Sequence, residues 1–256
     1  MAPLITLLTD FGTADSYVGE VKAVLASGVP GVALIDVTHQ VPPGDIRAGQ
    51  YLLSRVWHRF PPGTVHFVVV DPGVGTARRA LAAQAAGHYF VAPDNGLLSP
   101  LPAEARFVSL AVPTQAAPTF HARDVFAPAA ARLASGTLLA HLGAWVTDPV
   151  RAPLPAPCRD GVVVVGEVLY IDRFGTLVTN VPGELVEPGV RIKVGGTDVG
   201  TLRRTFGDVE QGQLVAFTGR GGGGGSGGSG GSVEIAVRGG SAARLLGVGV
   251  GAEVRA

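Results

Sequence analysis

The sequence is short of cysteine, of charge and of long apolar runs, and each shortage excludes a class of protein. Cys158 is the only cysteine in 256 residues, so no disulfide forms within the chain, and a reducing cytoplasm is the expected compartment. No apolar run approaches the ~18 residues that a membrane-spanning helix needs. The N-terminus also lacks the basic and apolar segments of a signal peptide. We therefore expect a cytoplasmic protein with no membrane partner.

Charge is scarce and balanced. Twenty acidic and twenty basic residues cancel, and only 16% of the residues are charged. The absence of a basic surplus argues against nucleic acid as a partner. A positive mean hydropathy of +0.35 is high for a soluble monomer and favours burial between subunits. We expect a homo-oligomer.

The first ~155 residues alternate between two hydrophobic periods. Apolar, β-branched runs predict strands at 4–8, 32–37 and 64–70, and helical spacing predicts helices at 17–26 and 45–60. Shorter strands near 81–84, 89–92 and 106–110 and a helix over about 125–134 follow. This order indicates an α/β domain over residues 1–155, with a mostly parallel sheet and flanking helices.

The hydrophobic pattern changes after residues 151–158, which are rich in proline and alanine and are interpreted as a linker. Beyond them no convincing helical pattern remains. Strand-like runs separated by glycine turns occupy 162–171, 177–181, 191–194, 197–202, 214–217 and 233–237. They predict a smaller all-β, barrel-like C-terminal domain over residues 160–256.

A glycine- and serine-rich stretch over residues 219–232 interrupts what otherwise reads as a hairpin. Its composition is that of a flexible linker. An engineered replacement and a natural low-complexity insertion both explain it. It is not a phosphate-binding loop, since it lacks the Lys-Ser/Thr ending, and its length costs the fold little.

Asp71 ends a run of valines and is followed by a Pro-Gly turn and by Arg78 and Arg79. Ligands bind beyond the carboxyl ends of strands in α/β sheets, so a short loop can return a cation beside this carboxylate at a functional edge. The alternative is an ordinary turn in which Asp71 caps the loop and both arginines are solvated.

Four further segments carry polar residues in a distinctive order. The set, with the Asp71 segment, is TDFGTADSYVG (9–19), VVVDPGVGTARR (68–79), APDNGLL (92–98), TFHARDVFAP (119–128) and IDRFGTLVTN (171–180). Together they resemble the S-adenosyl-L-methionine (SAM) hydroxide adenosyltransferase family, also called SAM hydrolases, which are relatives of fluorinase and chlorinase. The resemblance covers nearly the whole chain.

The resemblance implies hydrolysis of SAM to adenosine and L-methionine, with Asp71, Arg78 and His121 as the catalytic set. Water must attack the ribose C5′ in line with the sulfonium, and a carboxylate or an imidazole can accept its proton. Arginine can orient that water. The thioether leaves neutral, so no general acid, metal or cofactor is implied. Two alternatives remain: His121 packs beside Phe120 as a structural residue, or Arg79 faces the site instead of Arg78.

Substrate contacts in the first domain are also implied by the resemblance. Asp10 is expected to accept hydrogen bonds from the ribose diol; an Asx turn is the alternative. Asp15 either caps the following helix or contacts the substrate's amino group. Asp94 and Asn95 lie in a Pro-Asp-Asn-Gly turn, and one of them is expected to touch the ligand. His39 is interpreted as structural.

In the second domain, Asp172 and Phe174 match a family segment that meets the methionine and adenosine parts of the substrate. Thr176 stands where relatives often have asparagine, which alters that contact. Phe206 resembles an adenine-stacking aromatic, with a place in the barrel core as the alternative. Arg220 is a weaker candidate for the methionine carboxylate.

Two other functions compete with SAM hydrolysis. A halide-using adenosyltransferase needs a site free of negative charge, and Asp71 argues against it because two anions in a low dielectric repel. A nucleoside-binding protein without turnover is the second. The family resemblance further implies a homotrimer with sites at subunit interfaces.

Overall fold

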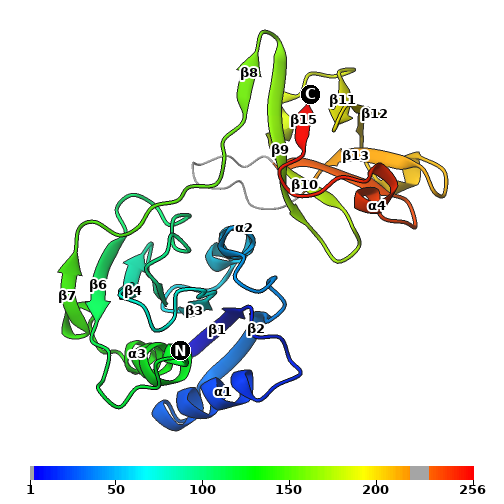
Figure 1. Ribbon diagram of the computed structural model, residues 1–256. Coiled ribbons are helices and arrows are strands. Elements are labelled where there is room, and N and C mark those ends of the chain that lie inside the picture. Colours follow the sequence, from blue (N-terminus) through cyan, green and yellow to red (C-terminus); the bar gives the residue numbers. More distant parts are fainter. Residues whose placement is uncertain (1–2, 220–230) are drawn as a thin grey trace. The chain divides into compact units, whose positions relative to one another are not determined.

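The computed structural model describes residues 3–219 and 231–256, and the chain divides into two compact units, Met1–Pro153 and Leu154–Ala256 (Figure 1). Arg220 and most of the glycine- and serine-rich stretch lie outside the described residues. No helix in the described ranges is long and apolar enough to cross a membrane.

A seven-stranded mixed sheet forms the centre of the first unit, in the order β2-β1-β3-β5-β4-β6-β7. Its β1, β2, β3 and β5 pair in parallel, and β4, β6 and β7 continue the sheet with antiparallel pairings. The bounds are β1 Leu4–Thr9, β2 Ala33–Thr38, β3 Val65–Val69, β4 Ala80–Ala85, β5 His88–Pro93, β6 Arg106–Leu110 and β7 Gly143–Val146. The α/β class is confirmed, and the short β7 was not anticipated.

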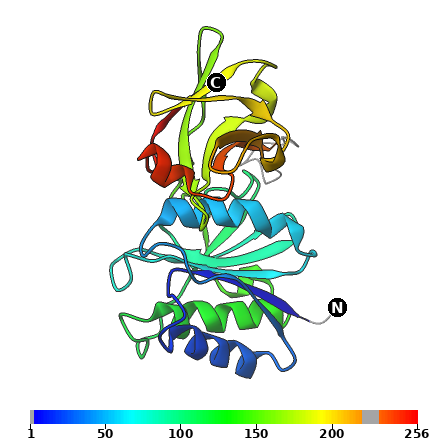
Figure 2. The ribbon, with the colours of Figure 1, turned by 90° about the vertical axis from the view of Figure 1, so that its right-hand side faces the viewer.

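Helices cover both faces of this sheet. Helices α1 (Tyr17–Gly28) and α3 (Ala127–Ala134) lie on one face and α2 (Ile46–Val56) on the other (Figure 2). Helices α1 and α3 pack closely because Gly28 has no side chain: a Cβ there would lie 2.8 Å from the Ala131 Cβ. Short helical turns complete the unit: η1 Trp57–Arg59, η2 Ala122–Phe126 and η3 Leu139–His141.

The helix expected over 45–60 is shorter than predicted. Asp45 caps it by accepting a hydrogen bond from the Ala48 amide at 2.9 Å. The α-helix ends at Val56, and η1 carries the chain to Phe60 before Pro61. The tighter turn satisfies the last carbonyls where proline forbids another helical turn.

The order of the parallel strands gathers the loops that follow them. Strand β1 lies between β2 and β3, with helices on opposite faces in the connections β1-α1-β2 and β2-α2-β3. Ligand sites in such sheets form where the connections diverge, at the carboxyl ends of the strands. Asp10 follows β1, His39 follows β2 and Asp71 follows β3 by two residues, so all three belong to this edge.

The second unit is a closed barrel of seven strands. Its ring runs β10-β14-β13-β12-β11-β15-β9 and closes through the β9–β10 pairing, while β8 pairs with the first residues of β9, Val163 to Val165. The bounds are β8 Cys158–Asp160, β9 Val163–Ile171, β10 Leu177–Pro182, β11 Arg191–Val194, β12 Thr197–Arg203, β13 Leu214–Thr218, β14 Ser232–Val237 and β15 Glu253–Arg255, with turns η4 Gly183–Leu185 and η5 Phe206–Asp208. The all-β, barrel-like expectation is confirmed.

Two elements of this unit contradict the sequence interpretation. A short helix, α4 (Ala242–Leu246), follows β14 although no helix was expected there. Ser241 caps it by accepting from the Arg244 amide, and Gly247 ends it at a φ of 64°. The three-residue β15 then completes the ring. The expected hairpin does exist, because β13 and β14 pair antiparallel up to Thr218 opposite Val233.

Two histidines are buried in the sheet of the first unit. His66 on β3 lies between Thr6, whose Oγ1 is 2.8 Å from Nδ1, and His88, whose Nδ1 is 3.2 Å from Nε2. Its ring stacks on Phe90 with centroids 4.9 Å apart. Burial, and secondarily the neighbouring His88, lower the pKa of His66 to about 3.

This depressed pKa predicts acid sensitivity. The unfolded chain binds a proton at His66 below its ordinary pKa of about 6.5 and the folded chain does not, so stability is present above that pH and is lost as the pH falls toward 3. The expected slope reaches about 1.4 kcal/mol per pH unit. Urea unfolding between pH 6.5 and 5 measures it while carboxylates stay ionised. His66→Gln should flatten the slope and His141→Gln, at an exposed position, should not; equal slopes in all three proteins contradict the assignment.

Candidate active site

Asp71, Arg78 and His121 form one contiguous cluster. Arg78 Nε donates to Asp71 Oδ1 at 3.0 Å, and its Nη2 donates to Asp71 Oδ2 in a close ion pair. The same Nη2 lies 3.0 Å from His121 Nδ1. The Asp71 and Arg78 side chains are only 7% and 9% exposed, so the pair is shielded from water.

A tight loop returns Arg78 to Asp71. The Val74 amide donates to the Asp71 carbonyl at 3.3 Å, and the Thr76 hydroxyl donates to the Gly73 carbonyl at 2.7 Å. Gly75 has a φ of 78°, and a Cβ on it would lie 2.8 Å from the Pro118 carbonyl oxygen. Only glycine allows this close approach, which brings the loop beside the segment that leads to His121.

His121 precedes a π-helical turn, η2, which leads into α3. Asp124 stabilises this turn by accepting from the Ala117 amide at 2.8 Å. Arg123 clamps Asp124 with two hydrogen bonds, of 2.7 and 2.9 Å, and reaches Glu20 on α1 at 2.8 Å. π-Helical turns are rare and often mark functional sites. These ion pairs therefore fix the segment that presents His121.

The contacts of His121 determine its protonation. A guanidinium can only donate hydrogen bonds, so Nδ1 accepts from Arg78 and the neutral ring carries its proton on Nε2. Burial and the adjacent Arg78 charge lower the pKa of His121, against the weaker opposing effect of Asp71. The ring is thus neutral near pH 7 and offers an N–H donor. In this arrangement Asp71 is the stronger candidate for a base.

One donor of the cluster is unused. Arg78 Nη1 is buried and has no hydrogen-bond partner within residues 3–219 and 231–256. The guanidinium also lies over the Phe126 ring, 5.4 Å from its centroid. A buried N–H without a partner is costly, and a bound water or substrate oxygen would satisfy it.

Arg79 points elsewhere. Its Nε donates to Asp94 Oδ2 at 2.6 Å and its Nη1 to Asp148 at 2.8 Å. Asp94 also accepts from the Val150 amide at 2.8 Å. Of the two arginines, Arg78 is the one that contacts Asp71 and His121, while Arg79 ties the end of β5 to residues 148–150.

The turn that holds Asp94 and Asn95 is occupied by contacts within the chain. Asn95 Nδ2 donates to the Val70 carbonyl at 2.9 Å, and Asn95 Oδ1 accepts from the Leu97 amide at 3.2 Å. The first bond holds the ends of β3 and β5 together, and the second stabilises the turn itself. The expectation that Asp94 or Asn95 touches a ligand stays a prediction.

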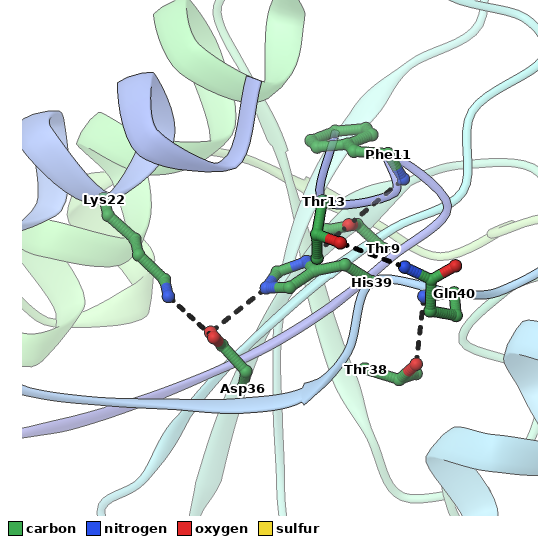
Figure 3. Close-up of polar contacts among 8 residues, drawn as sticks. All are labelled: Thr9, Phe11, Thr13, Lys22, Asp36, Thr38, His39 and Gln40. Atoms are coloured by element: carbon green, nitrogen blue, oxygen red, sulfur yellow. Dashed lines mark hydrogen bonds and ion pairs between the residues drawn. The ribbon is translucent and has the colours of Figure 1, made fainter. Parts of the chain in front are cut away.

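Asp10 lies in a loop fixed by its neighbours. Its Oδ2 accepts from the Gly44 amide at 2.8 Å. The Phe11 amide donates to Thr9 Oγ1 at 3.3 Å, and the Gly12 amide donates to the His39 carbonyl at 2.7 Å. Figure 3 shows His39 between Thr9 and Asp36 beneath this loop. Asp10 and Asp71 thus occupy loops at the same edge of the sheet.

Asp15 is exposed and makes no cap. Ser16 takes the N-cap position of α1 without a side-chain capping bond, and its hydroxyl donates to Glu20 at 2.8 Å. The capping explanation for Asp15 is therefore wrong. Its contact with a substrate amino group stays a prediction.

The candidate residues of the second unit lie in two loops of the barrel. Asp172 Oδ1 accepts from the Phe174 and Thr176 amides at 2.9 and 2.8 Å, which is an Asx turn. Phe174 is 76% exposed, whereas Thr176 is buried. Phe206 is 42% exposed and packs against Phe217 with ring centroids 5.0 Å apart. Phe206 is therefore a partly exposed aromatic, not a core residue.

Sequence reasoning missed the residues that support these side chains. Thr9, Arg123 and Asp124 stand inside the quoted segments, but their spacing alone did not suggest a role. The one available signal was adjacency, since each lies within three residues of Asp10 or His121. Among the described residues, no group of three or more His, Cys, Asp or Glu side chains is placed to hold a metal ion.

The fold and the site together define a class: a mixed α/β unit with a charged cluster at the carboxyl edge of its parallel strands, followed by a closed β-barrel. The profile of the SAM hydroxide adenosyltransferase N-terminal domain matches residues 5–143, and that of the C-terminal domain matches residues 166–255. The chain belongs to the SAM hydroxide adenosyltransferase family.

Individual relatives agree with this membership. The chain is 43% identical to the (R)-S-adenosyl-L-methionine hydrolase of Thermus thermophilus, over 98% of both chains. It is 31% identical to the fluorinase of an Actinoplanes species, over 70% of this chain and 72% of that one. The crystal structure of an uncharacterized conserved protein from Thermotoga maritima superposes with a TM-score of 0.88 at 36% identity, covering 98% of each chain.

The charged cluster predicts how the His121 pKa responds to mutation. Arg78→Gln removes a positive charge that lowers it and leaves Asp71, which raises it, unopposed. The pKa of His121 should therefore rise. Histidine ring signals followed by NMR against pH measure the change, with His121→Gln assigning the signal.

Arg79→Gln is the matched control, because Arg79 bonds Asp94 and Asp148 instead. It should leave the His121 titration unchanged. A shift of equal size in both arginine variants would contradict the contact between Arg78 and His121.

Proposed function

We propose that the chain hydrolyses SAM to adenosine and L-methionine, using Asp71, Arg78 and His121 as its catalytic residues. The observation that carries the proposal is the arrangement of this cluster: a carboxylate held by a guanidinium, a neutral imidazole and one unused buried donor. Its full-length relative in Thermus thermophilus carries the name of that activity.

The chemistry follows from the charges of the reactants. Water attacks the ribose C5′, the C–S bond breaks, and the electron pair leaves with sulfur as the neutral thioether of methionine. Asp71 accepts the proton that the attacking water loses and passes it to solvent. The unused Nη1 of Arg78 donates to one lone pair of the water oxygen and orients it, and the other lone pair attacks C5′. The Nε2–H of His121 donates to the oxygen as Asp71 removes its proton and a further lone pair becomes available.

Halide transfer is disfavoured by the electrostatics of the same cluster. The Arg78 charge is already matched by Asp71 at hydrogen-bond distance, and His121 is neutral near pH 7. A halide ion would bring an uncompensated negative charge into a site that already contains a carboxylate. Water brings none.

Substrate binding is assigned to loops of both units. We propose that Asp10 accepts hydrogen bonds from the ribose diol and that Asp15 and Asp172 meet the methionine end. Phe174 and Phe206 offer exposed rings to the adenosine part, and Thr176 borders that loop. We also propose that Asp94 or Asn95 touches the ligand from the turn that their hydrogen bonds hold in place.

Incubation with SAM followed by chromatography tests the reaction. The assay contains chloride and fluoride and uses both epimers at sulfur, since the Thermus relative is named for the R form. Adenosine and methionine in equal amounts are expected. A 5′-halo-adenosine would identify a halide-using enzyme, and binding without any product would identify a non-catalytic protein.

Variants then separate chemistry from binding. Asp71→Asn and His121→Gln should each lower kcat by about a hundredfold or more while the KM changes little, because they act on the water in the transition state. Asp10→Asn should mainly weaken binding of adenosine. Asp198→Asn, in an exposed ion pair with Arg191 on the barrel, is the control and should match the wild type. Normal turnover by Asp71→Asn would overturn the base assignment.

We further propose a cytoplasmic homotrimer with active sites at subunit interfaces. The low charged fraction and positive mean hydropathy favour burial between subunits, and the single cysteine suits a reducing compartment. The trimer itself is carried by the family resemblance. The exposed Phe174 ring is a surface that a neighbouring subunit can use.

Subunit mixing tests the shared site. An Asp71→Asn chain and a Phe174→Ala chain are each expected to be impaired as homo-oligomers. After mixing and subunit exchange, hybrid interfaces contain one intact pairing, so activity should recover to a measurable fraction of the wild type. Sedimentation fixes the oligomeric state. A monomer that hydrolyses SAM at micromolar concentration would overturn the shared site.

A further inference from the structure

A bulge in β2 directs a buried histidine under the Asp10 loop. Strand β2 pairs with β1 in parallel, and Leu7 lies opposite Asp36 while Leu8 lies opposite Thr38, so Val37 is an extra residue. Bulges of this kind re-aim the side chains that follow them. His39 accordingly lies at the end of β1, where it is only 5% exposed.

His39 contacts β1 through its ring. Its Nδ1 is 2.8 Å from Thr9 Oγ1, and its Nε2 is 3.1 Å from Asp36 Oδ1 (Figure 3). Nε2 is in ion-pair contact with Asp36 but makes no hydrogen bond of good geometry. A lone pair on Nε2 would repel the carboxylate, so the proton lies on Nε2 and Nδ1 accepts from the Thr9 hydroxyl. Lys22 holds Asp36 from α1 at 2.7 Å. The direction of the hydrogen bond between Thr9 and His39 is thereby set: the hydroxyl donates and the imidazole accepts.

The same two residues also bind the backbone of the Asp10 loop. Thr9 Oγ1 accepts from the Phe11 amide at 3.3 Å, and the His39 carbonyl accepts from the Gly12 amide at 2.7 Å. Gly12 adopts a φ of 67° at this contact. The two residues that follow Asp10 are therefore fixed by Thr9 and His39, and Gly44 fixes the Asp10 carboxylate.

We propose that Thr9 and His39 are positioning residues for ribose recognition: they hold the Asp10 loop in its binding conformation and thereby set the affinity for adenosine, without acting on the reacting water. This inference rests on the proposed function, since it assigns the Asp10 carboxylate to the ribose diol. A pre-ordered loop loses little conformational freedom when the ligand binds. Without the hydrogen bonds to Thr9 and His39, the Asp10 loop must be ordered when adenosine binds, and this ordering lowers the affinity for adenosine.

A matched pair at Thr9 tests the proposal. Thr9→Val keeps the shape of this 1%-exposed side chain and removes its hydroxyl; Thr9→Ser keeps the hydroxyl. Thr9→Val should raise the adenosine Kd and the SAM KM by about tenfold, with kcat unchanged within about threefold. Thr9→Ser should stay within about threefold of the wild type in every constant. Calorimetry with adenosine and steady-state kinetics with SAM supply the readouts.

A second pair at His39 decides the question if Thr9→Val does not fold. His39→Asn places an amide oxygen where Nδ1 accepts and should retain adenosine affinity, whereas His39→Leu should weaken it. Equal adenosine affinity in Thr9→Val and the wild type, or equal damage from Thr9→Ser and Thr9→Val, would overturn the proposal. So would a loss confined to kcat.

Amide hydrogen exchange separates this inference from the proposed function. The Phe11 and Gly12 amides should exchange faster in Thr9→Val than in the wild type, whether or not a ligand is present. A wild-type protein that neither binds adenosine nor cleaves SAM would refute the function while this exchange test still stands. Unchanged exchange in Thr9→Val, in a protein that cleaves SAM, would refute the clamp alone.

Discussion

The buried ion pair between Arg78 and Asp71 is the interaction on which the rest of the site depends. Removing two charges from water is costly, and their attraction offsets that cost only with good geometry and further hydrogen bonds. The bidentate contact supplies the geometry, and His121 Nδ1 accepts a further hydrogen bond from the guanidinium. This contact also decides the tautomer of His121. One pairing therefore fixes the charge of the cluster and the direction of its donors.

The loops around the ion pair are held in place by backbone contacts. At one of these contacts, a side chain would prevent the close approach. Gly75 lets the Arg78 loop approach the Pro118 carbonyl, and the π-helical turn after His121 is anchored by Asp124. Thr9, at the end of β1, and His39, just after β2, accept hydrogen bonds from the backbone of the Asp10 loop. The Arg78 loop is thus held by hydrogen bonds within itself, and the Asp10 loop is held by bonds to Thr9 and His39 at the ends of two strands.

The sequence predicts the parts of this site that depend on strand ends. Asp10 and Asp71 follow apolar runs and precede glycine turns, so their place at the carboxyl edge follows from local patterns. Local patterns do not show which of Arg78 and Arg79 faces Asp71. The two arginines are adjacent, and only the conformation of the loop decides where each side chain points. The helix α4 and the strand β15 are three to five residues long, too short for periodicity to reveal. Exposure of Phe174 likewise depends on tertiary packing.

A neutral cluster suits a cationic substrate and an uncharged nucleophile. Asp71 and Arg78 cancel, and the lowered pKa of His121 removes the remaining charge near pH 7. A free carboxylate would hold the sulfonium too well in the ground state, and binding that is equally strong before and during reaction does not accelerate it. A net positive cluster would repel the sulfonium and attract anions. In the proposed reaction, the guanidinium restrains the Asp71 carboxylate, so Asp71 accepts a proton from water only as the new bond to the reacting carbon forms.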